Sequence, residues 1–500
     1  MRTLSKSKLL AYRQCPKRLW LELSRPELRQ DSAQTQANFD VGHRVGDIAR
    51  KLYDPSGTGQ LIDPQVEGFA AAFSRTKALL NSPQPVFEAG FSAGGALAFA
   101  DVMQPVEQSS TLQWKMVEVK SSTSVKDYHR DDVAIQAFVA RTAGVALASI
   151  SLAHIDSSWT YPGADDYRGL LLEEDLTSEA FGRDAEVKSW IADAQAISCS
   201  ASEPTKGTGP HCSDPFECGF FDYCSSQEPQ AEYPVRWLPR IQAKELKALI
   251  ESNRSIDLRN VPDALLNDQQ QRVKTHTLSG EVYFDAAGAA ADLIAHKLPA
   301  YFLDFETIQF AVPIWAGTRP YQQIPFQFSL HYLATSGELT DQAFLDLSGA
   351  DPSPAFAQAL VAACGDSGPV FVYNAGFETA RIRELSERFP SLKDALLAIN
   401  ERVIDLLPVA RDHYYHPSQQ GSWSIKKVLP AVAPDLRYDA LEGVQDGGMA
   451  MTAFLEAISP KTTPPRKNEI ETQLLKYCGL DTFAMVRLWQ FFSCNNDLVK

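Results

Sequence analysis

Hydrophobic positions recur with helical spacing at the start of the chain and then with the alternation typical of β-strands. After Ser5, an apolar stripe is formed by Leu9, Leu10 and Tyr12, and it breaks at Cys15, which precedes a proline. The same periodicities predict helices over 36–53, 65–81 and 131–142, and strands over 86–91, 96–101, 116–119 and 146–153. Strands mixed with helices in this order predict an α/β domain.

A second α/β pattern begins at Leu298. It predicts strands over 301–304, 326–332 and 370–373, and helices over 354–363, 377–388, 392–400 and 467–492. The residues between the two patterns are polar and helix-prone, and prolines punctuate them. A chain of 500 residues is long enough for two or three domains. We therefore expect three parts: residues 1–228, a helical connector over 229–296, and residues 297–500.

Composition is ordinary for a globular protein, with 44% hydrophobic and 22% charged residues, so we expect folded structure throughout. The net charge of −15 argues against a protein that coats nucleic acid non-specifically, because phosphate binding depends on Lys and Arg. It still permits a local basic groove. The first helical segment carries cations that suit such a groove or an ordinary solvated face: Lys6, Lys8, Arg13, Lys17 and Arg18.

Targeting signals are not evident in the sequence. No charged segment with an apolar run follows Met1, and no apolar run reaches the roughly 18 to 20 residues of a membrane span. We expect a cytoplasmic protein with no membrane partner. Eight cysteines are too few for a disulfide scaffold in a chain of this length, so clustered cysteines favour metal ligation.

The second α/β pattern carries acidic residues at three separated places. Asp304 and Glu306 alternate along a predicted strand, so both point to the same face. Such a pair also occurs by chance, but Glu378 follows another strand, and Tyr477 and Asp481 lie four residues apart on a predicted helix. Four carboxylates that share one site would repel each other unless they bound Mg²⁺ or Mn²⁺. Two such ions about 4 Å apart can stabilise the oxygens of a phosphodiester.

These residues resemble the three motifs of the DnaQ-like (DEDD) 3′-5′ exonucleases, which have a ribonuclease-H-like fold. The order is Asp304-x-Glu306, then Asn374-Ala-Gly-Phe-Glu378, then Tyr477-x-x-x-Asp481, and the tyrosine indicates the DEDDy branch. The resemblance implies that the four acids hold metal and that Tyr477 orients the attacking water. Glu378 stands where the family usually has Asp.

Two further features lie near this pattern. Asp405 is an additional acid with either a structural or a functional role. The segment 421–427 contains Trp423, Lys426 and Lys427, which suit base stacking and phosphate contact, or form a solvated loop.

The first α/β pattern contains a smaller acidic group. Asp101 ends an apolar strand, and alternation points Glu118 and Lys120 the same way on the next strand. Carboxylates bind metal, and a lysine activates water or steadies a phosphate. An exposed charged hairpin would have the same residues. Gln136 on the following helix and His43 upstream favour the functional interpretation.

The order His43, Asp101, Glu118-x-Lys120 and Gln136 resembles the PD-(D/E)XK nucleases of the RecB family over residues 1–228. The resemblance implies a restriction-endonuclease-like fold, metal ligation by His43, Asp101 and Glu118, and catalytic roles for Lys120 and Gln136. Position 140, where the RecB motif has tyrosine, is alanine. The layout is most similar to the CRISPR-associated RecB-like exonucleases, which carry an iron-sulfur cluster.

Four cysteines bracket this region. Cys15 lies near its start, and Cys212, Cys218 and Cys224 follow at its end with five residues between successive cysteines. Four thiolates can hold a 4Fe-4S cluster or Zn²⁺. The family resemblance favours iron-sulfur. The other cysteines are expected to be ordinary buried thiols: Cys199, Cys364, Cys478 and Cys494.

Together these patterns predict a chain with two metal-dependent nuclease sites, the second a 3′-5′ exonuclease. The expected substrate is DNA with a single-stranded portion. RNA 3′-end processing is one alternative, and a nucleic-acid-binding scaffold with decayed nuclease sites is another.

Overall fold

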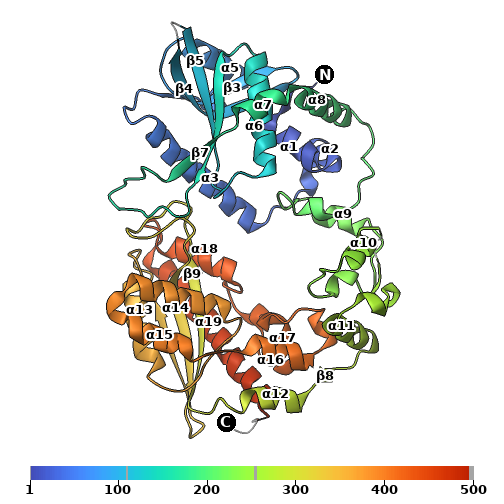
Figure 1. Cartoon of the computed structure of the whole chain (residues 1–500), viewed down its shortest axis with the longest axis vertical. Coiled ribbons are helices and arrows are strands. Elements are labelled where there is room, and N and C mark those ends of the chain that lie inside the picture. The colour runs from blue at the N-terminus through green and yellow to red at the C-terminus, as the bar shows by residue number, and fades with distance from the viewer. Residues whose placement is uncertain (1, 109–110, 253–255, 495–500) are drawn as a thin grey trace. The chain divides into compact units, whose positions relative to one another are not determined.

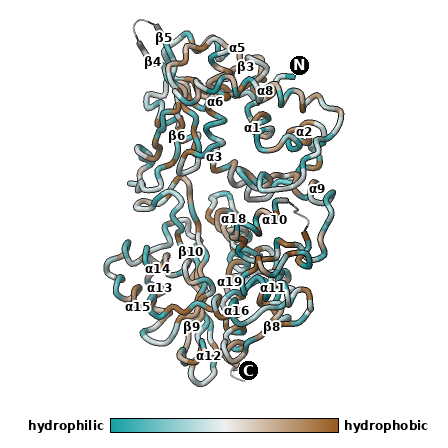
Figure 2. Tube along the Cα trace, turned by 45° about the vertical axis from the view of Figure 1, so that its right-hand side comes forward, coloured by the Kyte–Doolittle hydropathy of each residue, from teal (hydrophilic) through white to brown (hydrophobic). Residues whose placement is uncertain are grey.

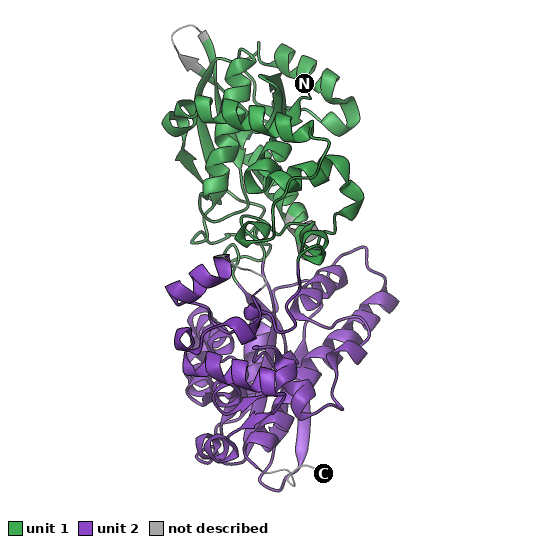
Figure 3. Ribbon diagram, turned by 90° about the vertical axis from the view of Figure 1, so that its right-hand side faces the viewer, with its two compact units in different colours: residues 1–228, 310–322 green, residues 229–309, 323–500 purple. Residues whose placement is uncertain are grey.

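The computed structural model of the chain describes residues 2–108, 111–252 and 256–494. Its secondary structure is mixed α/β (Figure 1), in agreement with the predicted class. The chain forms two compact units (Figure 3). Unit 1 contains residues 1–228 and 310–322, and unit 2 contains residues 229–309 and 323–500.

Unit 1 is built on one mixed sheet. Its strands are β1 (Leu4–Ser5), β2 (Gln60–Leu61), β3 (Val86–Ala93), β4 (Ala96–Gln108), β5 (Thr111–Val119), β6 (Leu147–Ile155) and β7 (Leu171–Asp175). They are ordered β2-β3-β4-β5-β6-β7, and β1 pairs with β4. Strand β4 pairs antiparallel with β3 and β5, whereas β6 is parallel to β5 and β2 is parallel to β3. The expected strands are therefore present, and several are longer than predicted.

Helix α6 (Asp127–Thr142) is central to unit 1. Its residues from Asp132 to Ala140 are all buried, and they include the polar side chains of Asp132 and Gln136. The other helices are α1 (Lys6–Gln14), α2 (Pro16–Ser24), α3 (Ala33–Tyr53), α4 (Pro64–Glu67), α5 (Phe69–Leu79), α7 (Thr177–Gly182), α8 (Asp184–Ser198) and α9 (Phe221–Ser226). Cys15 separates α1 from α2, as predicted. The single helix expected over 65–81 is wrong, because Gly68 adopts a φ of 80° and divides it.

Unit 2 contains a five-stranded mixed sheet in the order β11-β10-β9-β12-β13. The strands are β9 (Ala300–Ile308), β10 (Ile324–Leu333), β11 (Leu339–Leu345), β12 (Val370–Val372) and β13 (Val403–Asp405). Strand β9 pairs antiparallel with β10 and parallel with β12. A small second sheet joins β8 (Tyr283–Phe284) to β14 (Tyr414–Tyr415). The central position of β9 gives it a buried face on each side of the sheet.

Different helices cover the two faces of this sheet. Leu303 and Phe305 pack with α13 (Ser353–Cys364), α14 (Gly376–Arg388) and α15 (Lys393–Glu401). Phe302 packs on the other face with the end of α19 (Pro464–Phe492). The tube in Figure 2 is brown along stretches of β9, whose residues are mostly buried. Alternation therefore points Asp304 and Glu306 to the α19 face.

Residues 229–296 contribute to the core of unit 2. This segment contains α10 (Lys244–Ser252), α11 (Asp268–Ser279) and α12 (Ala286–Leu293). Its Leu258 and Val273 share a hydrophobic cluster with Phe302 and Trp489. The segment is helical, as expected, but the structure groups it with unit 2. Three further helices complete the unit: α16 (Leu406–His413), α17 (Ile425–Val432) and α18 (Gly447–Ala457).

Residues 310–322, by contrast, belong to unit 1. Ala311 and Val312 share a core cluster with Val45 and Ile155, and the Tyr321 hydroxyl donates a hydrogen bond to the Ser121 carbonyl. The sequence did not predict this excursion from the 297–500 region.

Among the described residues, no helix combines the length and the apolar composition that a bilayer span requires.

Candidate functional site

Three acidic residues of unit 2 converge although they are far apart in the sequence. Strand β9 supplies Asp304 and Glu306, and helix α19 supplies Asp481. One carboxylate oxygen from each lies within 4.8 Å of the other two. Oxygen ligands at this spacing suit a hard divalent cation.

Burial makes this arrangement electrostatically unfavourable without a cation. Burial and the charge of Asp481 raise the pKa of Glu306 to about 8. Burial likewise raises the pKa of Asp481 to about 6. The pKa of Asp304 lies well above its ordinary value, because it is buried and faces Asp481, Glu306 and Glu378. A bound cation would favour the ionised form of all these groups.

Glu378 lies near this group but outside its closest part. It occupies the first turn of α14, where its side chain is buried. Its Oε2 atom has no hydrogen-bond partner, and burial raises the pKa of Glu378 to about 8. Its charge contributes to the raised pKa of Asp304, so Glu378 lies in the neighbourhood of the acidic group. A buried oxygen without a partner is available to a metal ion.

Two tyrosines border the acids. Tyr477 is buried on α19, one turn before Asp481, as the i, i+4 spacing predicts. The hydroxyl of Tyr438 donates a 2.6 Å hydrogen bond to Oδ1 of Asp481. Burial and the charge of Asp481 raise the pKa of each tyrosine above its ordinary value, so both remain protonated donors. Sequence analysis missed Tyr438, which begins a three-residue 3-10 helix (Tyr438–Ala440), too short to give a periodic signal.

Asp405 has a structural role in this unit. Its carboxylate accepts hydrogen bonds from the backbone N–H groups of Asn374 at 2.8 Å, Ala375 at 3.1 Å and Leu407 at 2.9 Å. It thereby caps α16 and fixes the turn between β12 and α14. In this turn Asn374 adopts a φ of 78°, a conformation that asparagine tolerates. Because α14 begins directly after this turn, the turn also sets the position of Glu378 in the first turn of α14.

The segment 421–427 is not a base-stacking surface. Trp423 is buried, and its Nε1 donates a 2.7 Å hydrogen bond to the Tyr414 carbonyl. Lys427 is exposed. Lys426 instead extends over the rings of Tyr438 and Tyr477, with its Nζ 5.2 and 5.1 Å from the two ring centroids. Of the two predicted cations, Lys426 therefore lies beside the acidic group.

Glu118 is the centre of the polar group in unit 1. Its side chain is 1% exposed. Its Oε1 atom accepts from Lys120 at 2.6 Å and from Lys6 at 2.8 Å, and its Oε2 accepts from Gln136 at 2.6 Å. The structure thus brings together Glu118, Lys120 and Gln136, which the sequence singled out.

Asp132 is a second buried acid in this group, and sequence analysis missed it. It accepts from Lys120 at 2.7 Å and from Gln136 at 2.9 Å, and it pairs with Lys6 at 3.1 Å. Burial alone would raise the pKa of Asp132, but the charges of Lys120 and Lys6 hold it below its ordinary value. Its position four residues before Gln136, on the same helix face, was the available signal.

Asp101 lies beside Glu118. Its Oδ2 atom accepts a 2.7 Å hydrogen bond from the N–H of Val119. Burial and the charge of Glu118 raise the pKa of Asp101 well above its ordinary value. Glu88 is another missed neighbour: burial and the charge of Glu118 raise its pKa, and its φ is 54°. A non-glycine residue in this conformation is strained and is often found at functional sites.

His43 is less closely associated with these acids. It lies on α3, and its side chain is exposed. The charge of His43 acts against the raised pKa of Glu88, so His43 lies in the neighbourhood of that acid. The metal-ligand role expected for His43 stays a prediction.

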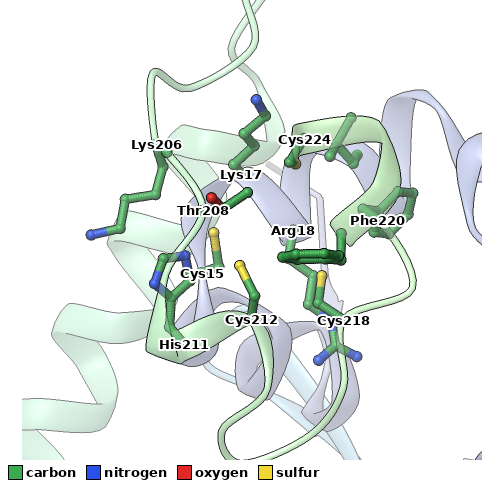
Figure 4. Close-up of a pocket in the computed structure, with 13 residues that line it drawn as sticks. Cys15, Lys17, Arg18, Lys206, Thr208, His211, Cys212, Cys218, Phe220 and Cys224 are labelled. Carbon is green, nitrogen blue, oxygen red and sulfur yellow. The ribbon is translucent and has the colours of Figure 1, made fainter. Parts of the chain in front are cut away.

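The four bracketing cysteines line one pocket (Figure 4). Cys15 reaches it from the junction of α1 and α2, and Cys212, Cys218 and Cys224 reach it from the segment that ends unit 1. Burial raises the pKa of Cys224 to about 11, and the other three cysteines are among the causes. The four thiols therefore lie around the same pocket.

Cations also line this pocket: Lys17, Arg18 and Lys206. Two of them pair with acids, since Lys17 lies 2.7 Å from Glu203 and Arg18 lies 2.9 Å from Glu22. The remaining cysteines differ from expectation in part. Cys364 and Cys478 are buried as predicted, but Cys199 and Cys494, which follow the last residues of α8 and α19, are exposed.

Comparison with known proteins gives two matches. Residues 301–424 match a family described as "Domain of unknown function (DUF2779)". This range contains Asp304, Glu306 and Glu378 and ends before Tyr477 and Asp481. The chain is also similar to "Uncharacterized protein MG366" of Mycoplasma genitalium, with 26% identity over an alignment of 226 residues that covers 41% of this chain. The match spans a third of that relative's length, 33%.

Proposed function

We propose that the chain is a metal-dependent nuclease that hydrolyses phosphodiesters in DNA. The convergence of Asp304, Glu306 and Asp481 within 4.8 Å carries this proposal. Three buried acids from two distant elements, with Glu378 in their neighbourhood, form an arrangement that destabilises a fold unless a cation is bound. The cations that prefer such ligands, Mg²⁺ and Mn²⁺, serve phosphodiester hydrolysis in many enzymes.

In unit 2 the residues fit a site for such ions. Asp304, Glu306 and Asp481 would be ligands, and the unpaired oxygen of Glu378 would complete the set. Bound ions would polarise the phosphodiester and lower the pKa of the attacking water. The protonated hydroxyl of Tyr477 would orient that water. The central strand of a mixed sheet carries two of the acids, which supports a ribonuclease-H-like fold and DEDDy-type 3′-5′ exonuclease chemistry.

In unit 1 the polar group supports a second site of the PD-(D/E)XK type. Asp101 and Glu118 would hold the metal, with His43 as a further ligand. Lys120 lies 2.6 Å from Glu118 and would contact the attacking water or the phosphate. Gln136 orients Glu118 through its hydrogen bond. In the absence of metal, the ammonium groups of Lys6 and Lys120 neutralise the charge of Glu118 and Asp132.

The cysteine pocket supports a 4Fe-4S cluster as a structural cofactor. Four thiolates from the two ends of unit 1 would tie those ends together through the cluster. Zn²⁺ would satisfy the same four ligands. Visible absorption with iron and zinc analysis of anaerobically purified protein separates the two cofactors.

Cleavage assays test this function directly. We expect the full chain to degrade 3′-overhang DNA with Mg²⁺ or Mn²⁺, and Asp304→Asn combined with Glu118→Gln to abolish cleavage. Each single variant should retain the activity of the other site. Asp439→Asn, a change at an exposed acid, should behave as wild type. Intact cleavage by the double variant would overturn the proposal.

The same assay decides among the alternatives. RNA of matched sequence, degraded faster than DNA, would indicate RNA 3′-end processing. Tight binding of single strands with no cleavage in either metal would indicate a scaffold whose sites have decayed. We expect DNA to be the better substrate and the protein to act in the cytoplasm.

A further inference from the structure

Lys426 has an unusual environment beside the acidic group of unit 2. It lies in the first turn of α17, and its Nζ donates a 2.7 Å hydrogen bond to the Gln445 carbonyl. The rings of Tyr438 and Tyr477 flank it at 5.2 and 5.1 Å. These contacts fix the position of the ammonium group, because each ring attracts a cation at this distance.

The ammonium is close to the acids without pairing with them. Its charge acts to lower the pKa of both Glu306 and Asp481. Among the residues that the structure describes, however, none forms an ion pair with Lys426. Unit 1 shows the opposite arrangement, since Lys120 contacts Glu118 and Asp132 directly at 2.6 and 2.7 Å. A lysine that served only to neutralise the acids of unit 2 would pair in that way.

We propose that Lys426 binds a non-bridging oxygen of the substrate's phosphate beside the acids of unit 2. The proposal rests on the proposed nuclease function and adds a substrate contact to it. An ammonium group has three donors, and the Gln445 carbonyl accepts from one of them. The other two N–H donors can therefore bind the oxygens of a phosphate group at the site. Tyr438 and Tyr477 thus have a second role, because they hold the cation that contacts the substrate.

Lys426→Met tests the contact in the full chain carrying Glu118→Gln, so that any remaining cleavage belongs to unit 2. A charge-assisted hydrogen bond predicts a fall of about 10- to 100-fold in kcat/KM on single-stranded DNA. Lys426→Arg should recover part of this loss. Lys393→Met, an exposed lysine on α15 on the opposite face of the sheet, is the matched control and should have no effect.

Salt dependence separates a phosphate contact from a structural role. Loss of one contact to a single strand reduces the slope of log K against log salt by about 0.7. We would measure this slope by anisotropy of a fluorescent single strand with Ca²⁺ in place of Mn²⁺. Circular dichroism checks that the variant folds, and Lys426→Gln is a second neutral variant. A slope and a kcat/KM equal to those of Lys393→Met would overturn the proposal.

The two proposals fail in different ways. Cleavage by the Glu118→Gln chain that persists unchanged in Lys426→Met would refute the lysine contact and leave the nuclease function intact. A strand that binds with the lysine-dependent slope but is not cleaved would refute hydrolysis by unit 2 and support the phosphate contact.

Discussion

The Tyr438 hydroxyl donates a 2.6 Å hydrogen bond to Oδ1 of Asp481, which also lies within 4.8 Å of Asp304 and Glu306. The bond joins the short 3-10 helix Tyr438–Ala440 to the long helix α19 and fixes one carboxylate of the acidic group. Burial raises the pKa of Asp481, and the hydrogen bond from Tyr438 acts against that rise. Tyr438 therefore favours the ionised form, which is the form that binds metal.

Tyr438→Phe should weaken Mn²⁺ binding to unit 2 by about tenfold, because partners that orient metal ligands commonly contribute this much. Titration calorimetry of the Glu118→Gln chain measures the affinity. Tyr415→Phe is the matched control, since Tyr415 is also buried and its hydroxyl hydrogen-bonds to Thr277 at 2.7 Å. Equal affinities in the two variants would show that Tyr438 does not support the metal site.

Metal binding to unit 2 should release protons near pH 7. Burial, with the charge of Asp481, raises the pKa of Glu306 to about 8, and burial does the same for Glu378. Both are largely protonated at pH 7 without metal, and a metal ion displaces those protons. Mn²⁺ affinity should therefore increase from pH 6 to about 8 and then level off. Calorimetry in two buffers of different ionisation enthalpy counts the protons.

The raised pKa of Glu306 also makes the stability of the fold depend on pH. A carboxyl group whose pKa is higher in the folded than in the unfolded protein contributes its full stability at pH values below its ordinary pKa of 4.5. That contribution is lost as the pH rises to about 8. The free energy of unfolding of the metal-free protein should fall between pH 4.5 and about 8, and that of Glu306→Gln should fall less. Identical pH profiles of unfolding for the two proteins would contradict the raised pKa of Glu306.

Asp132→Asn should destabilise unit 1 by about 3 kcal/mol, because it leaves Lys6 and Lys120 with one buried carboxylate to share. Urea denaturation followed by fluorescence measures the change. Asp127→Asn, an exposed acid in the first turn of the same helix, should cost less than about 1 kcal/mol. A larger effect at Asp127 than at Asp132 would show that the buried ion pairs do not stabilise the unit.

Cys15→Ser should remove most of the bound iron or zinc, because Cys15 is the one cysteine that reaches the pocket from the start of the chain. Metal analysis and visible absorption after anaerobic purification measure the loss. Cys199→Ser, at an exposed cysteine, should retain the full metal content. If both variants bind equal amounts of metal, the pocket is not the cofactor site.

Local patterns allowed much of the fold to be predicted. The alternation in β9 placed Asp304 and Glu306 on one face, and the i, i+4 spacing in α19 placed Tyr477 beside Asp481. These inferences held because strands and helices impose fixed side-chain periods. The α/β class followed from the same periods.

Other features depend on tertiary packing, which no local period specifies. Lys6 reaches Glu118 across 112 residues of sequence, and Tyr438 reaches Asp481 from a 3-10 helix of only three residues. The exposed strand β11 has no alternating apolar pattern, so nothing in its sequence distinguished it from a loop. Trp423 has the residue type of a stacking platform, but its burial is decided by its neighbours.

The excursion of residues 310–322 limits how the protein can be dissected. The polypeptide passes from one unit to the other after residues 228, 309 and 322. A fragment that stops at Glu228 lacks Ala311 and Val312, which pack in its interior. Unit 1 therefore cannot be expressed as an uninterrupted piece with all of its own residues, and a fragment that spans unit 2 also carries residues 310–322 of unit 1. Inactivating substitutions in the intact polypeptide are the appropriate way to assign activities to each half.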